Sequence, residues 1–132
     1  MSLKEEIEST DKPIIIDGHY SHDLLDNPSL VVVLRKAPWE LQEKLQLRLY
    51  GYEKVWENLD AEIMGVIAFE TQGKFPIECI HEENTTGKTP QETAEDILAV
   101  IRGEKNPSIE PIDWVTYPET LRVLVNRTCI LS

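Results

Sequence analysis

The sequence predicts an α/β domain with a parallel sheet, and three observations lead to this prediction. Residues 14–16 are three consecutive isoleucines, and residues 30–34 read Leu-Val-Val-Val-Leu, so both runs are continuously apolar. Runs that do not alternate between polar and apolar residues are typical of parallel strands covered on both faces. Segments with helical spacing of apolar residues separate the later strands, and this interleaving is the pattern of α/β proteins.

Composition and charge narrow the class of protein. The chain has 132 residues, enough for one domain, and its 41% hydrophobic and 28% charged residues are ordinary for a globular protein. Its 24 acidic and 13 basic residues give a net charge of -11, which argues against a broad electrostatic interface with nucleic acid or an anionic membrane. A nucleotide ligand remains compatible with this charge, because a few local cations are enough to hold phosphates.

The cysteines and the apolar runs predict a cytoplasmic protein. Cys79 and Cys129 lie far apart and form no CxxC pattern, so we expect reduced thiols. The longest apolar runs are much too short to span a bilayer, and no signal peptide is visible at the N-terminus. We therefore expect a cytosolic chain without a membrane partner.

The strand at residues 14–16 leads directly to residues that carry chemistry. Asp17 follows it before a glycine, so the aspartate stands at the carboxyl end of the strand, where open α/β sheets bind ligands. Because His19 and His22 come directly behind, this carboxylate indicates phosphate and metal chemistry. The alternative is that Asp17 only caps a turn.

Other polar residues have simpler interpretations. A zinc site formed by His19, His22 and His81 would need a spacing that ties the three together, and the sequence has none, so each is expected to form hydrogen bonds instead. Arg35 follows the strand at residues 30–34 and is expected to be a solvated charge at the strand end.

Two helices are predicted after the second strand. The first begins at Ala37 with Pro38 in its first turn, and helical spacing continues until Gly51. Its apolar residues are Trp39, Leu41, Leu45 and Leu49. The second is predicted as one long helix from Glu53 to near Gly73 with an apolar face. That face consists of Val55, Leu59, Ile63, Val66 and Ile67.

The remaining elements complete the order. Residues 4–9 have the character of the last turns of a helix, and residues 75–80 are predicted to form a third strand, followed by a polar loop at 83–88. Thr89-Pro90-Gln91-Glu92 then has the pattern of a capping box and opens a helix that ends at Gly103. The apolar run at residues 121–125 predicts a further strand.

Four segments occur in an order that resembles a known family. They are Ile15-Ile16-Asp17-Gly18-His19, Val33-Leu34-Arg35, Arg48-Leu49-Tyr50 and the run from Glu57 to Ile63. In this the chain is similar to the small adenylate kinases of archaea, relatives of the eukaryotic nuclear adenylate kinase that also acts in ribosome assembly. The resemblance implies a three-layer, parallel-sheet fold of the P-loop nucleoside-kinase type. It covers residues 1–114 with a lid at about residues 47–57, and leaves residues 115–132 as a tail of unknown role.

The resemblance also implies site residues and ligands. Asp17 and His19 match the family's Asp-x-His motif, in which the aspartate helps to hold the water shell of Mg²⁺ and the histidine is associated with nucleotide turnover. Arg48 takes the position that binds the phosphates of ATP. The loop at residues 83–89 lies where adenine packs, so Asn84 and Thr85 are expected to bind nucleotide. AMP or another nucleoside monophosphate would be the second substrate.

The sequence departs from the pattern of this family in two ways, and both bear on the activity that is expected. Position 49 is leucine where the family usually has glycine, and this difference bears on the flexibility that the resemblance implies for the lid. A Gly-x-x-x-x-Gly-Lys-[Ser/Thr] loop is absent from the 132 residues, and Gly87-Lys88-Thr89 lacks the leading glycine, so it is interpreted as a helix N-terminus. The chain is therefore expected to be the carboxyl-terminal part of a kinase, with little turnover of ATP plus AMP on its own. The alternative is a non-catalytic module that covers an open sheet edge with a partner or a second copy.

Overall fold

The structure, a computed structural model, describes residues 14–16 and 29–131 of the chain. The chain divides into two compact units, which are described separately. The first comprises Met1–Arg35 and Ile67–Glu110, and the second comprises Lys36–Val66 and Pro111–Ser132. In the part of the chain that the structure describes, no helix is long and apolar enough to cross a membrane.

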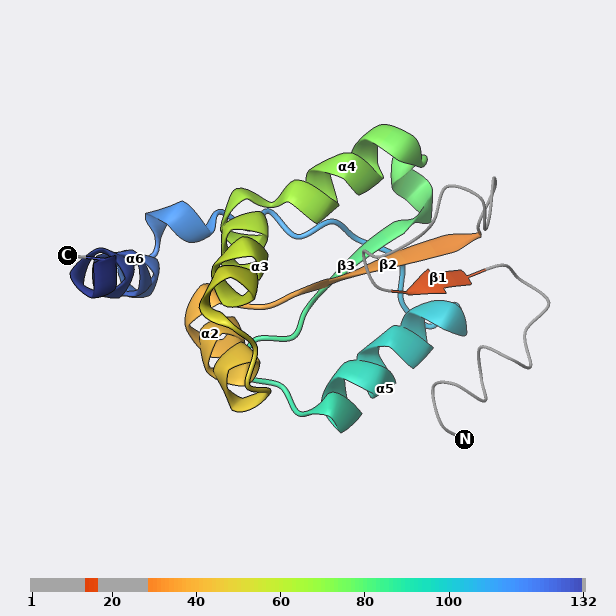
Figure 1. The fold of residues 1–132 in the computed structure, drawn as a ribbon. Helices are drawn as coiled ribbons and strands as arrows, with labels where there is room; N and C mark the ends of the chain where they lie inside the picture. Colours follow the sequence, from red (N-terminus) through yellow and green to blue (C-terminus); the bar gives the residue numbers. More distant parts are fainter. Residues whose placement is uncertain (1–13, 17–28, 132) are drawn as a thin grey trace. The chain divides into compact units, whose positions relative to one another are not determined.

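The first unit is built on a parallel sheet with the strand order β1-β2-β3 (Figure 1). The strands are β1 (Ile14–Ile16), β2 (Leu30–Arg35) and β3 (Ile80–Asn84). Ile15 pairs with Val31, and Val33 pairs with Glu82. The predicted α/β class, its parallel sheet and its first two strands are therefore confirmed. The prediction of a third strand at residues 75–80 is wrong, because the 3-10 turn Ile77–Cys79 lies there and β3 begins only after it.

Helices lie on opposite faces of this sheet (Figure 1). On one face α4 (Val66–Lys74) and the chain after it cover a cluster formed by Val31, Val33, Phe75 and Ile80. On the other face α5 (Pro90–Ile101) covers a cluster formed by Leu30, Val32, Ile97 and Val100. Neighbouring residues of β2 thus point to opposite, covered faces, which explains why the strand is apolar throughout.

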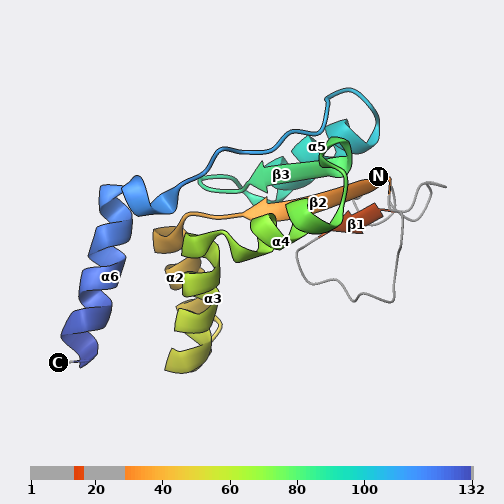
Figure 2. The same ribbon diagram turned by 90° about the horizontal axis from the view of Figure 1, so that it is seen from above.

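The second unit is helical. It contains α2 (Pro38–Leu47), α3 (Tyr52–Met64), the 3-10 turn η2 (Trp114–Thr116) and α6 (Pro118–Leu131). In both views α2 and α3 lie side by side (Figures 1 and 2). Their shared core consists of Leu45, Val55, Trp56, Leu59 and Val123.

Two predictions for the helices are corrected by the structure. The expected single helix from 53 to 73 is two helices, because Gly65 takes a left-handed conformation with φ of 65° and ends α3. The expected strand at 121–125 is part of α6, which begins at Pro118 and buries Val123 in the helical core. Four apolar residues in five cannot by themselves distinguish a strand from a buried helical segment.

One carboxylate joins three segments of the helical unit. The Oε1 atom of Glu62, on α3, accepts hydrogen bonds from the backbone N–H of Lys36 at 3.0 Å and from the indole N–H of Trp114 at 3.1 Å. Trp114 is buried, and its ring packs edge-on against Trp39 with 5.6 Å between centroids. Glu62 therefore ties the start of α2 and the turn before α6 to α3.

Candidate functional site

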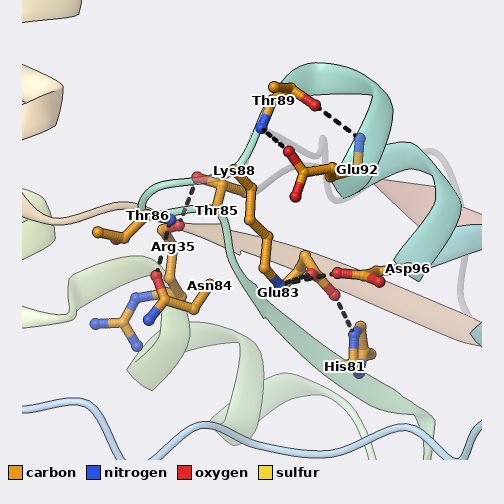
Figure 3. A network of polar contacts seen from close by, with 10 residues as sticks. All are labelled: Arg35, His81, Glu83, Asn84, Thr85, Thr86, Lys88, Thr89, Glu92 and Asp96. Carbon is orange, nitrogen blue, oxygen red and sulfur yellow. Dashed lines mark hydrogen bonds and ion pairs between the residues drawn. The ribbon is translucent and has the colours of Figure 1, made fainter.

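The candidate site lies at the carboxyl ends of β2 and β3, where a short loop connects β3 to α5 (Figure 3). The backbone N–H and the side-chain hydroxyl of Thr85 both donate to the carbonyl oxygen of Arg35, at 2.7 and 2.8 Å. The Oδ1 atom of Asn84 accepts from the backbone N–H of Thr86 at 3.1 Å. The two predicted nucleotide-binding residues, Asn84 and Thr85, are thus neighbours that shape the start of the loop.

The second half of the loop is a tight turn into the helix. The backbone N–H of Lys88 donates to the carbonyl of Thr85 at 3.1 Å, and Gly87 between them has φ of 73°, a conformation that favours glycine. The predicted capping box is confirmed: Thr89 accepts from the N–H of Glu92, and the carboxylate of Glu92 accepts from the N–H of Thr89. The loop backbone is therefore held at both ends.

A chain of polar contacts runs across the α5 face of β3 (Figure 3). The Nζ atom of Lys88 lies 2.8 Å from Glu83 Oε2 and 2.8 Å from Asp96 Oδ2. The other oxygen of Glu83 lies 2.8 Å from His81 Nε2. The backbone N–H of Ser108 donates to His81 Nδ1 at 3.2 Å, so this nitrogen carries no proton and Nε2–H donates to Glu83.

His81 therefore has the hydrogen-bonding role that the sequence favoured over a zinc ligand. Its imidazole is 1% exposed and each ring nitrogen has a partner. Within residues 14–16 and 29–131, no group of three histidines, cysteines or carboxylates is arranged to hold a metal ion. His19 and His22 lie outside these residues.

A second polar group occupies the α4 face of the same sheet edge. The guanidinium of Arg35 donates to Glu82 Oε1 at 2.8 Å, and the side-chain amide of Gln72 donates to Glu82 Oε2 at 3.0 Å. Arg35 is only 4% exposed, and the side chain of Glu82 is fully buried. The expectation that Arg35 is a solvated strand-end charge is wrong, because its partner comes from a strand 47 residues away in sequence.

The pKa values at the loop follow from these contacts. Hydrogen bonds to Asp96 and then to Glu83 raise the pKa of Lys88 above its usual value. The hydrogen bond from Lys88 lowers the pKa of Asp96 below 3.8. The contribution of Asp96 to stability is therefore fully present above about pH 4 and is lost as the pH falls through the lowered folded-state pKa. The contribution of Lys88 is present below about pH 10.5 and is lost at more alkaline pH.

The effect of pH gives a test for this ion pair. We expect Asp96→Asn to lower the stability of the sheet-containing unit at pH 7 by up to about 1 kcal/mol, because the pair is partly exposed. The difference from the unsubstituted chain should shrink as the pH falls below about 4 and on through the lowered pKa of Asp96, because the folded unsubstituted chain then becomes protonated at this carboxylate. Denaturation followed by circular dichroism at several pH values measures it. Glu95→Gln, at the preceding position of α5, is the control. A stability difference between Asp96→Asn and the unsubstituted chain that does not change with pH would contradict the ion pair of Lys88 and Asp96.

The predicted ATP-phosphate residue lies in the helical unit. Arg48 is exposed directly after α2, one helical turn beyond Lys44. Burial and then the charges of Arg48 and Lys36 lower the pKa of Lys44. Lys44 and Arg48 are four residues apart, so these two like charges are neighbours at the end of α2 and repel each other.

The remaining predicted catalytic and metal residues are not placed. Asp17 and His19 lie outside the residues that the structure describes. The structure thus brings Asn84 and Thr85 together and places Arg48 in the other unit. Sequence reasoning missed the network of His81, Glu83, Lys88 and Asp96, because no local spacing links residues from a strand, a loop and a helix.

Leu49, directly after Arg48, has a strained backbone. Its φ is 59°, a left-handed conformation, and its side chain is 90% exposed, so no packing compensates. Such a conformation costs a residue with a Cβ atom about 1–2 kcal/mol, and glycine avoids this cost. The backbone therefore has a conformation that favours glycine at the position where, by the resemblance, the family usually has glycine.

Substitution at position 49 tests this strain. We expect Leu49→Gly to be more stable than Leu49→Ala by about 1 kcal/mol, the reverse of the usual order, because alanine keeps the clash of the Cβ atom. All three tryptophans, Trp39, Trp56 and Trp114, lie in the helical unit, so denaturation followed by their fluorescence reports on it. An alanine variant as stable as the glycine variant would show that Leu49 is not strained.

Comparison with known proteins gives several relatives and no matching family model. A protein of Thermococcus kodakarensis named "Putative adenylate kinase" is 41% identical over 114 residues, which are 86% of this chain and 62% of the relative. Proteins of the same name from Methanocaldococcus jannaschii and Pyrococcus furiosus are 37% and 36% identical over 83% and 88% of this chain. The match covers 58% and 62% of those two relatives, so the chain spans about 60% of the length of these proteins.

Proposed function

Because this chain is a homologue of archaeal adenylate-kinase-like proteins, as the four ordered segments predicted, we propose that it forms part of a site for phosphoryl transfer between ATP and a nucleoside monophosphate. The single observation that carries the proposal is the identity of 36–41% over more than four fifths of the chain to three proteins of that name. For this chain, the activity named for the whole relatives is a proposal.

The proposed roles divide the work of phosphoryl transfer, which consists almost entirely of positioning and of stabilising charge. Arg48 holds the phosphates of ATP, and the loop formed by residues 83–89 holds the base. Asp17 serves Mg²⁺, which neutralises phosphate charge when bound, and His19 orients water or phosphate. AMP is the proposed acceptor.

The geometry of the loop supports its part of the proposal. Ligands of open α/β sheets bind at the carboxyl ends of the strands, and Asn84 ends β3 there while Thr85 directly follows it. Thr85 is tied to Arg35 by two hydrogen bonds, so the loop is formed before any ligand arrives. A preformed loop loses less conformational freedom on binding and so supports higher affinity.

Binding of ATP tests the proposal. The 132-residue chain is titrated with ATP in the presence of Mg²⁺, and the dissociation constant is measured by calorimetry. We expect saturable binding, and Arg48→Gln should weaken it by about tenfold or more, because a hydrogen bond to a charged group contributes about 1.5–3 kcal/mol. Arg122→Gln is the matched control, since Arg122 is an exposed arginine on α6. Absence of ATP binding, or equal weakening by the two substitutions, would contradict the proposal.

The second candidate is a non-catalytic module that associates through a sheet edge. At β3 the outer edge is partly occupied, because the N–H of Glu82 donates to the carbonyl of Ser108 at 2.8 Å. This contact disfavours strand addition beside β3. A chain that binds no nucleotide and self-associates with increasing concentration in sedimentation experiments would favour the module over the kinase.

A further inference from the structure

We infer that Lys88 is a positioning residue for the nucleotide: by pairing with Glu83 and Asp96 it holds the loop formed by residues 84–87 in its binding conformation. The inference rests on the proposed function, because it concerns the same loop. It adds a residue that acts through the loop backbone.

The pair of Glu83 and Lys88 joins the two ends of the loop. Glu83 is on β3 and Lys88 immediately precedes the cap of α5, so their 2.8 Å contact closes the four residues between them (Figure 3). Lys88 also reaches Asp96 at 2.8 Å, two helical turns into α5. One ammonium group therefore fixes the loop to both the strand and the helix that flank it.

The contact between Glu83 and Lys88 is strengthened by the burial of Glu83 in the sheet. The side chain of Glu83 is 3% exposed, and its second oxygen accepts from His81, which is itself held by the N–H of Ser108. A buried carboxylate with both oxygens bonded has one position, so the lysine that pairs with it is held as well. The side chain of Lys88 is 34% exposed. Its outer end is thus closer to solvent than its carboxylate partner.

The conformation of the loop backbone depends on the contact between Glu83 and Lys88. The N–H of Lys88 forms the turn to Thr85, and Thr85 is bonded to Arg35 on β2. Freeing the ammonium group removes the side-chain restraint on the carboxyl-terminal end of the turn, which then keeps the backbone bond from Lys88 to Thr85 and the capping box at Thr89. The expected consequence is a loop that samples more conformations and binds nucleotide less tightly, without loss of the sheet.

The test uses a substitution that leaves no buried charge unpaired. Glu83→Gln with Lys88→Met removes both charges together and keeps a side-chain amide beside His81. Glu104→Gln with Lys105→Met makes the same chemical changes at exposed positions after α5 and is the control. Lys88→Arg keeps the cation. For each full-length chain, the affinity for ATP is measured by calorimetry and amide hydrogen exchange is measured by NMR.

We expect the Glu83/Lys88 variant to bind ATP about tenfold more weakly, or about 1.4 kcal/mol. Exchange should accelerate at Thr85 and Lys88 while the β2 amides at residues 31–33 remain protected. Lys88→Arg should retain an affinity within about threefold of that of the unsubstituted chain, and the Glu104/Lys105 control should not change the affinity. These results together would establish that the ion pair positions the loop.

The contrary results separate the inference from the proposed function. If the unsubstituted chain binds ATP and the Glu83/Lys88 variant binds it equally well, the inference fails and the proposed function stands. Weaker binding that is accompanied by equal loss of protection in β2 would mean that the pair only stabilises the fold, and would also overturn the inference. If the unsubstituted chain binds no ATP, the proposed function fails, and the inference fails with it.

Discussion

We expect Arg35→Met to destabilise the sheet-containing unit by about 3–5 kcal/mol, the range for removing one partner of a buried ion pair. The guanidinium lies 2.8 Å from Glu82, whose side chain is completely buried. Without it, the carboxylate keeps the amide of Gln72 as its hydrogen-bond donor and has lost its cation. Because the tryptophans all lie in the other unit, circular dichroism or amide exchange of β2 measures this loss.

Two further variants make this prediction specific. Arg35→Met combined with Glu82→Leu removes both charges and should recover most of the stability, because an apolar pair of similar volume needs no desolvation of ions. Lys36→Met removes a cation at the next position, whose Nζ atom lies 3.8 Å from Glu40 Oε1, and should change stability by less than about 1 kcal/mol. A double variant as unstable as Arg35→Met alone would show that the buried charge is not the cause.

The second large effect is expected in the helical unit. Glu62→Ala should destabilise it by about 2–4 kcal/mol, because one carboxylate oxygen accepts from both Lys36 N–H and the buried indole of Trp114. Each donor left without a partner costs about 1–3 kcal/mol. Urea denaturation followed by tryptophan fluorescence measures the loss, because all three tryptophans lie in this unit.

Two variants on α3 serve as controls for this prediction. Glu62→Gln keeps an acceptor oxygen and should lose clearly less stability than Glu62→Ala. Glu57→Ala removes an exposed carboxylate from the same helix and should stay within about 0.5 kcal/mol of the unsubstituted chain. Equal losses from Glu57→Ala and Glu62→Ala would contradict the role given to Glu62.

Elements whose signal is local could be predicted from the sequence. β1 and β2 are continuous apolar runs, and both occur as parallel strands. The helix α5 has its capping box because Thr89 and Glu92 lie within one turn of each other. The helix α2 begins at Pro38, where proline fits the first turn, although it ends at Leu47, so that Leu49 lies beyond it.

Elements that depend on distant partners could not be predicted. β3 reads Ile-His-Glu-Glu-Asn, and all but its last residue are buried. A strand of this composition is stable because Arg35, Gln72 and Lys88 supply partners from other elements. The local sequence pattern does not indicate these partners. The sequence therefore predicts a strand at residues 75–80, largely before β3, where apolar residues are more frequent. Gly65 similarly ends a helix in the middle of an otherwise continuous apolar face.

The candidate site shows the same division. The resemblance predicts Asn84 and Thr85 as site residues, and the structure places Asn84 at the carboxyl end of β3 and Thr85 at the start of the loop that follows. Whether they bind nucleotide is a prediction that ATP titration decides. The sequence predicts Gly87-Lys88-Thr89 to be a helix N-terminus, and this prediction is correct for Thr89, which caps α5. The lysine itself gains its role from Asp96, eight residues later, and from Glu83 on the strand.

The central claim, that this chain binds ATP through Arg48 and the loop at residues 84–88, is tested most directly by NMR. Amide resonances of the ¹⁵N-labelled chain are followed while ATP and Mg²⁺ are added. The account predicts saturable shifts concentrated at residues 84–88 and at Arg48, with small shifts on the exposed side of α6. Resonances of the loop and of Arg48 that do not move while ATP is in excess, or shifts confined to other elements, would contradict it.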